Sequence, residues 1–225
     1  MNTNNCLLKD IIIVIKKTIL LKIRPIMKVQ YFLLVYFWVL GTFSFAQQKD
    51  VFFEVIFNDE KIGTLHAKEL VSGKKTVKNL SIDTDTKYLF VTVHVESEVH
   101  TIYENGILIE GTAYRDANHG SDNVQARVTK IGSKTYQRSR NGVNDKIFNK
   151  NITFCIIDLY FKEPVGITKV FSNMYAEMLT LKKVSPGKYQ LITPDNNDSF
   201  YTYKNGKLVI IEVNIIAGKV LSKRI

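Results

Sequence analysis

Hydrophobic and polar residues alternate with a period of two through most of the chain from Val51 onward. The alternation is clearest over Tyr88–Tyr103, where the odd positions are largely apolar and the even positions from 94 to 100 are His, Glu, Glu and His. This pattern predicts a long β-strand with one buried face and one face in solvent, as in antiparallel sheets.

The turn that follows this strand has a sequence that occurs twice. Tyr103-Glu-Asn-Gly106 recurs near the C-terminus as Tyr203-Lys-Asn-Gly206. Asn-Gly favours the left-handed backbone conformations that tight hairpin turns require. The repeat therefore predicts two similar β-hairpins, each entered by a tyrosine.

The alternation also bears on the length of the loop. A two-residue loop would pair Tyr103 with Leu108 and place Glu110 on the buried face, whereas a three-residue loop pairs Tyr103 with Ile107 and leaves Glu110 in solvent. We therefore predict a three-residue loop with Gly106 in the left-handed conformation. The same argument gives the same loop in the second copy.

Further alternating or apolar runs, separated by turn residues, predict the other strands. They are Val51–Phe57, Lys61–Val71, Thr76–Thr84, Asn123–Ile131, Lys134–Arg138, Leu179–Val184, Lys188–Thr193, Ser199–Tyr203, Lys207–Ile216 and Val220–Arg224.

Helical signals are confined to two short segments, Thr153–Tyr160, which ends before Glu163-Pro164, and Val170–Thr180. No spacing suits β-α-β units. We predict an all-β fold, an antiparallel meander of about a dozen strands forming a strongly curved sheet or barrel-like fold, with at most one or two short helices.

The N-terminal region resembles an export signal. From Met27 the chain has a short basic stretch, an apolar run over Tyr31–Leu40, and small residues at Ser44 and Ala46. These are the parts of a secretory signal peptide. We predict a signal peptide over residues 27–46, cleavage near Ala46 and export to the periplasm or beyond. The remaining residues 47–225 would form a single β domain with no stable membrane span.

Residues 1–26 precede this complete signal and contain two apolar runs of their own. Three explanations are open: translation starts at Met27, the signal has an extended basic region, or a first membrane helix exists. We favour a start at Met27. The competing interpretation of Val29–Ala46 is an uncleaved membrane anchor, because its 18 residues lie near the lower limit for a membrane span.

Composition changes the picture less than the net charge of +10 suggests. Of the 31 Lys and Arg residues six precede residue 47, as does one of the 21 Asp and Glu residues, so the remainder has a net charge of +5. These charges are interspersed, and we therefore expect no nucleic-acid binding.

Cys155 is the single cysteine after the signal, which excludes an intrachain disulfide in the exported form. Its apolar neighbours indicate a buried side chain.

Four motifs together resemble an uncharacterised family of small secreted bacterial all-β proteins, known as a domain of unknown function. They are Phe53-Glu-Val-Ile-Phe-Asn with Lys61-Ile-Gly63, Tyr103-Glu-Asn-Gly, Leu159-Tyr-Phe-Lys-Glu-Pro164, and Tyr201-Thr-Tyr-Lys-Asn-Gly206. The resemblance covers nearly all of residues 50–225 and implies a secreted β-rich domain. It implies no catalytic residues.

Two sets of residues are candidates for chemistry. His94, Glu96, Glu98 and His100 share one face of a strand, and imidazole with carboxylate suits zinc. Positions two apart on a strand are separated by about 6.6 Å, so four such ligands cannot all reach one ion. We expect a solvated face and no metal or other cofactor.

The second candidate is a pair of carboxylates. Glu163 precedes a proline, which favours an extended or turn conformation, and Glu177 follows in the next loop region. Together they could serve as general acid and base, although no spacing argument brings them together. The Asp195–Asp198 tract is typical of a turn and lacks the spacing of a calcium-binding loop.

These observations favour a non-enzymatic β domain that binds an apolar ligand or an envelope partner. One alternative is a hydrolase of envelope or carbohydrate material that uses acidic residues such as Glu163 and Glu177. Another is an interaction module that pairs through its sheet edges, for which Val220–Arg224 is the candidate edge strand.

Overall fold

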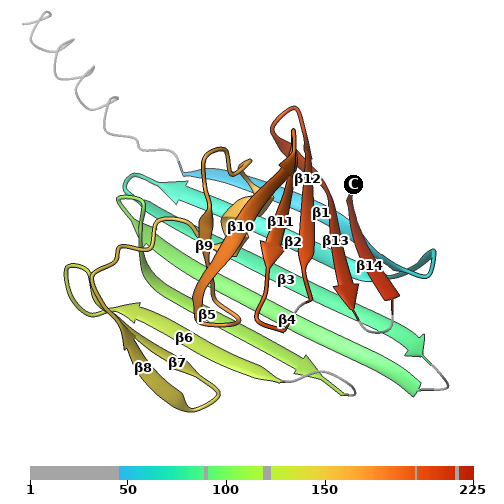
Figure 1. Cartoon of the computed structure of the whole chain (residues 1–225), viewed down its shortest axis with the longest axis horizontal. Helices are drawn as coiled ribbons and strands as arrows, with labels where there is room; N and C mark the ends of the chain where they lie inside the picture. The colour runs from blue at the N-terminus through green and yellow to red at the C-terminus, as the bar shows by residue number, and fades with distance from the viewer. Residues whose placement is uncertain (1–45, 89–90, 119–122, 196, 216–217) are drawn as a thin grey trace, which may run out of the picture. The chain divides into compact units, whose positions relative to one another are not determined.

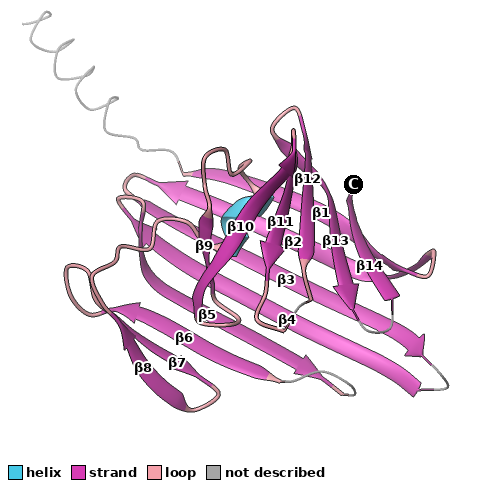
Figure 2. Cartoon of the chain, in the orientation of Figure 1, coloured by secondary structure: helices cyan, strands magenta, loops and turns pink. Residues whose placement is uncertain are grey.

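Fourteen β-strands and one short 3-10 helix, η1, make up the part of the chain that the computed structural model describes, which is residues 46–88, 91–118, 123–195, 197–215 and 218–225 (Figure 1, Figure 2). The first eight strands are β1 (Gln47–Phe57), β2 (Glu60–Ser72), β3 (Lys75–Tyr88), β4 (Val91–Glu104), β5 (Ile107–Ala117), β6 (Val124–Lys130), β7 (Tyr136–Arg140) and β8 (Val143–Ile147). After η1 (Ile156–Tyr160) come β9 (Lys169–Ser172), β10 (Glu177–Ser185), β11 (Lys188–Ile192), β12 (Ser199–Lys204), β13 (Lys207–Ile215) and β14 (Gly218–Arg224).

The predictions for residues 1–26 and for the signal peptide up to residue 45 lie outside the described residues. The described residues contain no helix with the length and apolar character that crossing a membrane would require.

All fourteen strands belong to one sheet in which every pair of neighbours is antiparallel. The order is β8-β7-β6-β5-β4-β3-β2-β1-β14-β13-β12-β11-β10-β9, so two meanders, β1–β8 and β9–β14, meet where β1 pairs with β14. The prediction of an antiparallel all-β meander is therefore confirmed. The proposed edge strand Val220–Arg224 is wrong, because it belongs to β14, which has a partner on each side.

The expectation of a strongly curved or barrel-like sheet is also wrong, because the sheet is neither closed nor strongly curled. Closure would require β8 to pair with β9, and these strands form the two opposite edges. The segment between them occupies the β9 edge instead, where Cys155 forms a parallel bridge with Phe171. The backbone N–H of Phe171 donates to the carbonyl of Phe154 at 2.9 Å.

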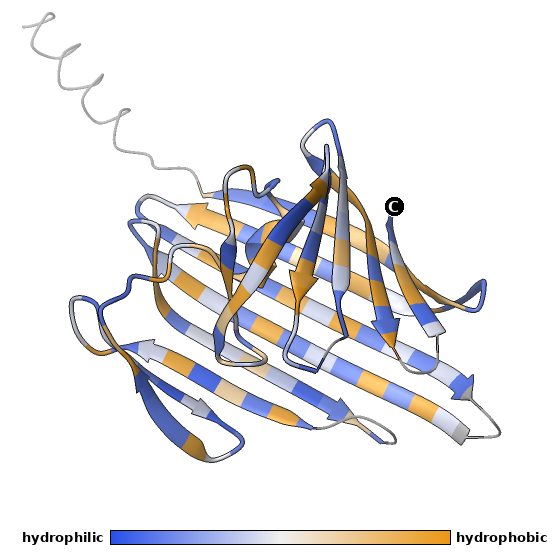
Figure 3. Ribbon diagram, viewed as in Figure 1, coloured by the Kyte–Doolittle hydropathy of each residue, from blue (hydrophilic) through white to orange (hydrophobic). Residues whose placement is uncertain are grey.

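Alternation along the strands is visible as orange and blue bands in Figure 3. In β4 the side chains of Ser97, Thr101 and Tyr103 are buried, whereas Glu96 and Glu98 are exposed. The predicted strand and its two faces are therefore confirmed for residues 91–104.

The predicted three-residue hairpin loop is wrong. Asn105 and Gly106 both have positive φ, 50° and 74°, and Glu104 pairs with Ile107, so the loop has two residues. The second copy is the same, with φ of 53° and 72° at its Asn-Gly pair. Positive φ at both central positions is the geometry for which Asn-Gly is selected.

A β-bulge two residues after each loop corrects the register. Tyr103 pairs with Leu108 but Ile102 pairs with Glu110, which leaves Ile109 as the extra residue. The side chain of Leu108 is therefore buried, and Glu110 still points to the solvated face. Predicting a solvated Glu110 was right although the loop length was wrong.

Side chains from both meanders form the main hydrophobic core around η1, and a smaller cluster gathers Ala113, Val124, Ala126 and Ala176. Phe53 of β1 contacts Tyr160 edge to face, with ring centroids 5.9 Å apart. Tyr203 of β12 donates its hydroxyl hydrogen to the carbonyl of Leu159 at 2.7 Å.

Of the two predicted helical segments, Thr153–Tyr160 contains η1, which begins after Cys155. The other, Val170–Thr180, forms the β9–β10 hairpin instead.

The turn between β9 and β10 connects the two meanders through side chains rather than by strand pairing. Arg138 and Arg140 of β7 donate to the carbonyls of Ala176 and Met174 at 2.9 and 2.8 Å. The buried side chain of Asn173 lies against Gly111, where a Cβ atom would come within 2.2 Å of its Nδ2 atom. A glycine is therefore required at position 111 for this close approach.

Candidate functional site

The outward side chains of β1–β6 form rows that cross the strands, because these strands pair in continuous register. What we call the Phe52 row contains Phe52, His66, Ser81, Glu98, Tyr114 and Gln125. The His100 row on one side of it contains Asp50, Lys68, Asn79, His100, Thr112 and Arg127. The Glu96 row on the other side contains Glu54, Thr64, Asp83, Glu96 and Asp116.

A hollow of about 250 Å³ lies on this face over β3, β4 and β5. The outward side chains that line it come from the Phe52 and His100 rows: Asn79, Ser81, Glu98, His100, Thr112 and Tyr114. Ser81 and Thr112 are short and stand diagonally across β4, between the larger Glu98, His100 and Tyr114. The alternation of short and long side chains on three neighbouring strands therefore forms the hollow.

Polar groups that can both donate and accept hydrogen bonds surround the hollow. Nδ1 of His100 is 2.5 Å from Oδ1 of Asn79, which fixes the orientation of the imidazole ring. The charge of Asp116 raises the pKa of the Tyr114 phenol, whose hydroxyl can both donate and accept a hydrogen bond. Glu98 supplies one carboxylate and makes no ion pair with any described residue.

Among the described residues of this face, two aromatic rings are exposed. Tyr114 borders the hollow and is 38% exposed, and Phe52 lies at the β1 end of the same row and is 47% exposed. The Phe52 ring stacks on the imidazole of His66, with centroids 4.3 Å apart and planes 6° from parallel. Nε2 of His66 is 2.8 Å from a carboxylate oxygen of Asp50, so the stacked pair is held in place.

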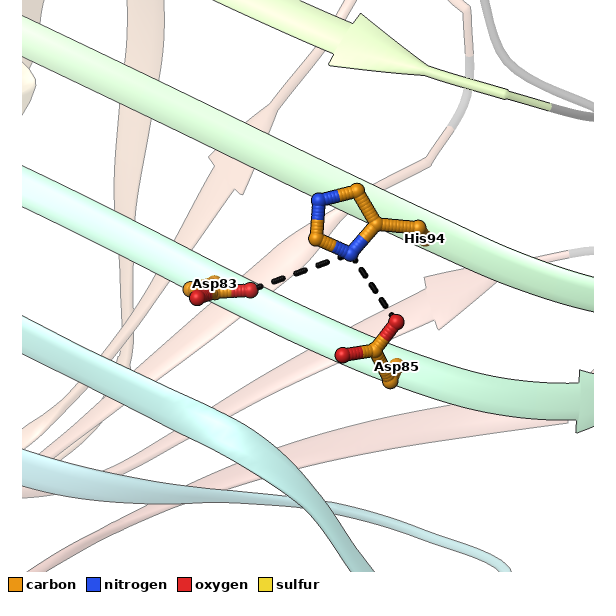
Figure 4. A group of neighbouring side chains, drawn as sticks. All are labelled: Asp83, Asp85 and His94. Carbon is orange, nitrogen blue, oxygen red and sulfur yellow. Dashed lines mark hydrogen bonds and ion pairs between the residues drawn. The ribbon is translucent and has the colours of Figure 1, made fainter.

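The four residues considered as metal ligands lie on the solvated face, but the structure groups only one of them with other candidate ligands. His94 lies opposite Asp85 of β3, with 2.9 Å between Nδ1 and Oδ1, and its Nδ1 is 3.9 Å from Asp83 (Figure 4). The hydrogen bond to Asp85 raises the pKa of His94. The ligand atoms of the three side chains lie within 4.8 Å of one another, and this donor set could hold a divalent cation.

The three side chains are 45 to 70% exposed, and His94 already contacts both carboxylates, which accounts for their arrangement without a metal. The other three candidates lie elsewhere. Glu96 belongs to the Glu96 row, and Glu98 and His100 line the hollow. Spacing along one strand could not identify Asp83 and Asp85, because the group depends on the register between β3 and β4.

The two carboxylates considered for acid–base chemistry make different contacts. Glu163 accepts a hydrogen bond from the Tyr189 hydroxyl at 3.0 Å. Glu177 lies in β10 opposite Ser172. No hydrogen bond or ion pair joins the two carboxylates in the described part of the chain, and their catalytic role stays a prediction.

A buried charged group inside the sheet was not predicted. Lys78 of β3 lies 2.6 Å from Asp158 of η1 and 2.6 Å from Glu69 of β2. Burial lowers the pKa of Lys78, but the charges and hydrogen bonds of the two carboxylates outweigh it and raise that pKa overall. Asp158 also accepts from the Tyr103 hydroxyl at 2.5 Å and from the backbone N–H of Cys155 at 2.6 Å. This group anchors η1 to the first meander.

The sequence contained one signal of this buried group. Lys78 lies on the apolar face of the predicted strand Thr76–Thr84, where a lysine is unusual. A buried lysine requires a charged partner. The partner could not be named from the sequence, since Asp158 lies in a different part of the chain.

These features define an all-β domain built as an open antiparallel meander with a polar hollow on its solvated face. The chain belongs to the family described as "Domain of unknown function (DUF6134)", which matches residues 53–224. The predicted resemblance to such a family is therefore confirmed. The chain matches no curated protein and no solved structure.

Proposed function

We propose that this protein is an exported, non-enzymatic β domain that binds a polar ligand or an envelope partner through the solvated face of β3–β5. The observation that carries the proposal is the hollow, where polar side chains from three strands converge on a space of about 250 Å³. Ligand sites are concave and contain a few placed polar groups that fix the orientation of the ligand, and the hollow shares these two features.

The surroundings of the hollow favour a polar ligand over the apolar ligand that the sequence suggested. Its outward side chains are polar apart from the ring of Tyr114. The large apolar side chains of the inner face are instead buried in the core around η1, including Phe53, Tyr189 and Leu208. An apolar ligand would have to displace them.

Binding is favoured over hydrolysis by the placement of the acidic residues. General acid–base hydrolysis of a glycosidic bond requires two carboxyl groups on either side of the bond. Glu163 is bound to Tyr189, and no contact relates it to Glu177. The hollow itself contains a single carboxylate, Glu98.

Export is supported by the leader sequence alone. Intact-mass measurement of the protein recovered from the periplasm or medium of the producing cell tests it. A chain that begins at Gln47 is the expected result. A chain that still carries residues 27–46 in the membrane fraction would contradict the proposal.

Binding through the hollow is tested by filling it. We expect the purified wild-type protein to co-sediment with envelope fractions of the producing cell and Ser81→Tyr to lose this binding, because the larger side chain occupies the hollow. Ser133→Tyr is the matched control, since Ser133 is exposed in the β6–β7 turn. Equal binding by both variants, with unchanged thermal unfolding, would contradict the proposed site.

A further inference from the structure

We infer that the ligand of this face is an extended, neutral glycan that lies along the Phe52 row and crosses β1–β5. The inference rests on the proposed function and names its ligand class. It follows from the positions of the exposed rings, the size of the hollow and the distribution of charge.

The two exposed rings of the row are separated by the length of a short oligosaccharide. Phe52 lies on β1 and Tyr114 on β5, four strand spacings apart, which is about 19 Å. A flat aromatic ring in water offers a surface on which the C–H face of a sugar ring can stack, and the burial of both surfaces is favourable. Two such rings on one line select an elongated ligand rather than a compact one.

The residues between the rings provide hydrogen-bonding groups and no apolar barrier. His66, Ser81 and Glu98 occupy consecutive positions of the row, each facing solvent. Sugar hydroxyls both donate and accept, and this mixture of carboxylate, hydroxyl and imidazole groups suits them. At about 250 Å³ the hollow is smaller than the range of about 300–1,000 Å³ typical of drug-sized ligands, so it fits one sugar ring of a longer chain.

The charges beside the row favour a neutral chain. The Glu96 row contains four carboxylates. Glu54 pairs with Lys61 at 2.9 Å, and the other three, of Asp83, Glu96 and Asp116, would repel an anionic polymer. The His100 row on the other side contains Lys68, Arg127 and the carboxylate of Asp50. Arg127 pairs with Glu110 at 2.9 Å, so Lys68 is the cation of this row that would repel a strongly cationic chain. A neutral glycan that lies between the two rows is repelled by neither of them.

The Phe52 ring is also held before any ligand binds. Phe52 is fixed by stacking on His66, which Asp50 orients, and both rings extend from strands whose backbones are paired on each side. Ordering such groups costs little on binding, so shallow contacts of this kind can still give measurable affinity.

The experiment is isothermal titration of the purified protein with neutral oligosaccharides of gluco, manno, xylo and N-acetylgluco configuration, from disaccharide to hexasaccharide. We expect binding of at least one series, with affinity that increases with length until the chain reaches both rings. Tyr114→Ala and Phe52→Ala should each weaken the longest ligand by about tenfold, as expected for the loss of one stacking contact. Phe52→Ala should leave the affinity for the disaccharide of the same series unchanged.

Phe148→Ala is the matched control, because Phe148 is 62% exposed and lies outside the row. It should bind like the wild type. Tyr114→Phe should retain most of the affinity, since it keeps the ring. The inference is overturned if no oligosaccharide binds, or if affinity is the same in the Phe52→Ala and Tyr114→Ala variants as in the control.

Failure of this inference is distinct from failure of the proposed function. If Ser81→Tyr abolishes envelope binding but protease treatment of the envelope does so as well, and no oligosaccharide binds, the ligand is a protein and only the glycan inference falls. If Ser81→Tyr has no effect on envelope binding, the proposed function falls.

Discussion

The β4–β5 and β12–β13 hairpins share a sequence signature and a backbone, yet they differ on the face that meets solvent. Both have a two-residue Asn-Gly loop followed by a bulge, at Ile109 in the first and Val209 in the second. Both also direct a tyrosine hydroxyl at η1, from Tyr103 to the Asp158 carboxylate and from Tyr203 to the Leu159 carbonyl. The inward side chains of both hairpins therefore have a structural role, which is to hold η1.

On the outside, the difference lies in how charge is compensated. In the second hairpin Glu212 forms ion pairs with Lys188 and Lys219 at 2.9 and 3.2 Å, and the ammonium group of Lys188 lies 5.3 Å from the Phe200 ring centroid. In the first hairpin Glu110 pairs with Arg127 at 2.9 Å, but Glu98 has no ion pair with any described residue, and its neighbours surround the hollow. The same backbone unit therefore carries an ion-paired carboxylate, Glu212, in one place and, among the described residues, an unpaired carboxylate, Glu98, in the other.

The largest effect is expected at Asp158 of η1, which accepts a hydrogen bond from Tyr103 of the first hairpin. Asp158→Ala removes one of two carboxylates beside the buried Lys78 and the acceptor of the Tyr103 hydroxyl. Breaking a buried ion pair costs about 3–5 kcal/mol, so urea unfolding should show a loss of that order. Asp145→Ala is the control, because Asp145 makes an exposed ion pair with Arg138 that is worth at most about 1 kcal/mol. Similar losses in both variants would show that the buried group does not stabilise the fold.

The two inner tyrosines should differ when their hydroxyls are removed. Tyr103→Phe loses a hydrogen bond to a charged carboxylate, worth about 1.5–3 kcal/mol, and Tyr203→Phe loses one to a neutral carbonyl, worth about 0.5–1.5 kcal/mol. Chemical denaturation of the two variants side by side measures the difference. An equal or reversed order would mean that the ionised Asp158 does not strengthen its contact.

The two hairpin turns should be equally sensitive. Gly106→Ala and Gly206→Ala place a Cβ at φ of 74° and 72°, where an L-residue pays about 1–2 kcal/mol relative to glycine. Both losses should be the same within error, since neither glycine has another atom within 4 Å of its added Cβ. Thermal unfolding of the pair checks this. A large difference would indicate that one turn is strained by its surroundings.

The smallest effect concerns the outer carboxylates. Hydrogen bonding to Lys188 lowers the pKa of Glu212 below its ordinary value of 4.5, so its contribution is complete above that value and is lost as pH falls through the lowered folded-state pKa. Glu212→Gln should therefore lower Tm slightly at neutral pH and not in strong acid. Glu98→Gln should leave Tm unchanged at neutral pH, because no ion pair is lost. If Glu98→Gln lowered Tm as much as Glu212→Gln, the two carboxylates would contribute equally to stability, and the proposed difference between the hairpins would be wrong.

Local patterns predicted the strands well because alternation reports directly on which side chains are buried. They failed at the loop because two solutions satisfy the same alternation. A three-residue loop and a two-residue loop followed by a bulge both place Glu110 in solvent, and only the pairing of Tyr103 with Leu108 separates them. The bulge leaves no mark on the pattern of polar and apolar positions.

Pairings between distant segments were beyond the sequence for a different reason. The short run over Val220–Arg224 has the composition of an edge strand, with lysines near its ends, and nothing local indicates β1 as its neighbour. The candidate site shows the same limit. Its polar stripe, His94 to His100, was predicted, but the hollow depends on Ser81 and Thr112 of the adjacent strands.

The pairing of β1 with β14 has a consequence for the order in which the molecule folds. Phe53 pairs with Arg224, so the centre of the sheet joins the beginning of the described chain to its end. Contacts of such long sequence separation form slowly, since the entropy of closing the intervening chain is lost before the contact stabilises anything. During synthesis each meander can assemble separately, but β1 and β13 keep open backbone edges until the seven-residue strand β14 pairs with them. In that interval the chain is most exposed to edge-to-edge aggregation, and the pairing of β14 with β1 and β13 ends it.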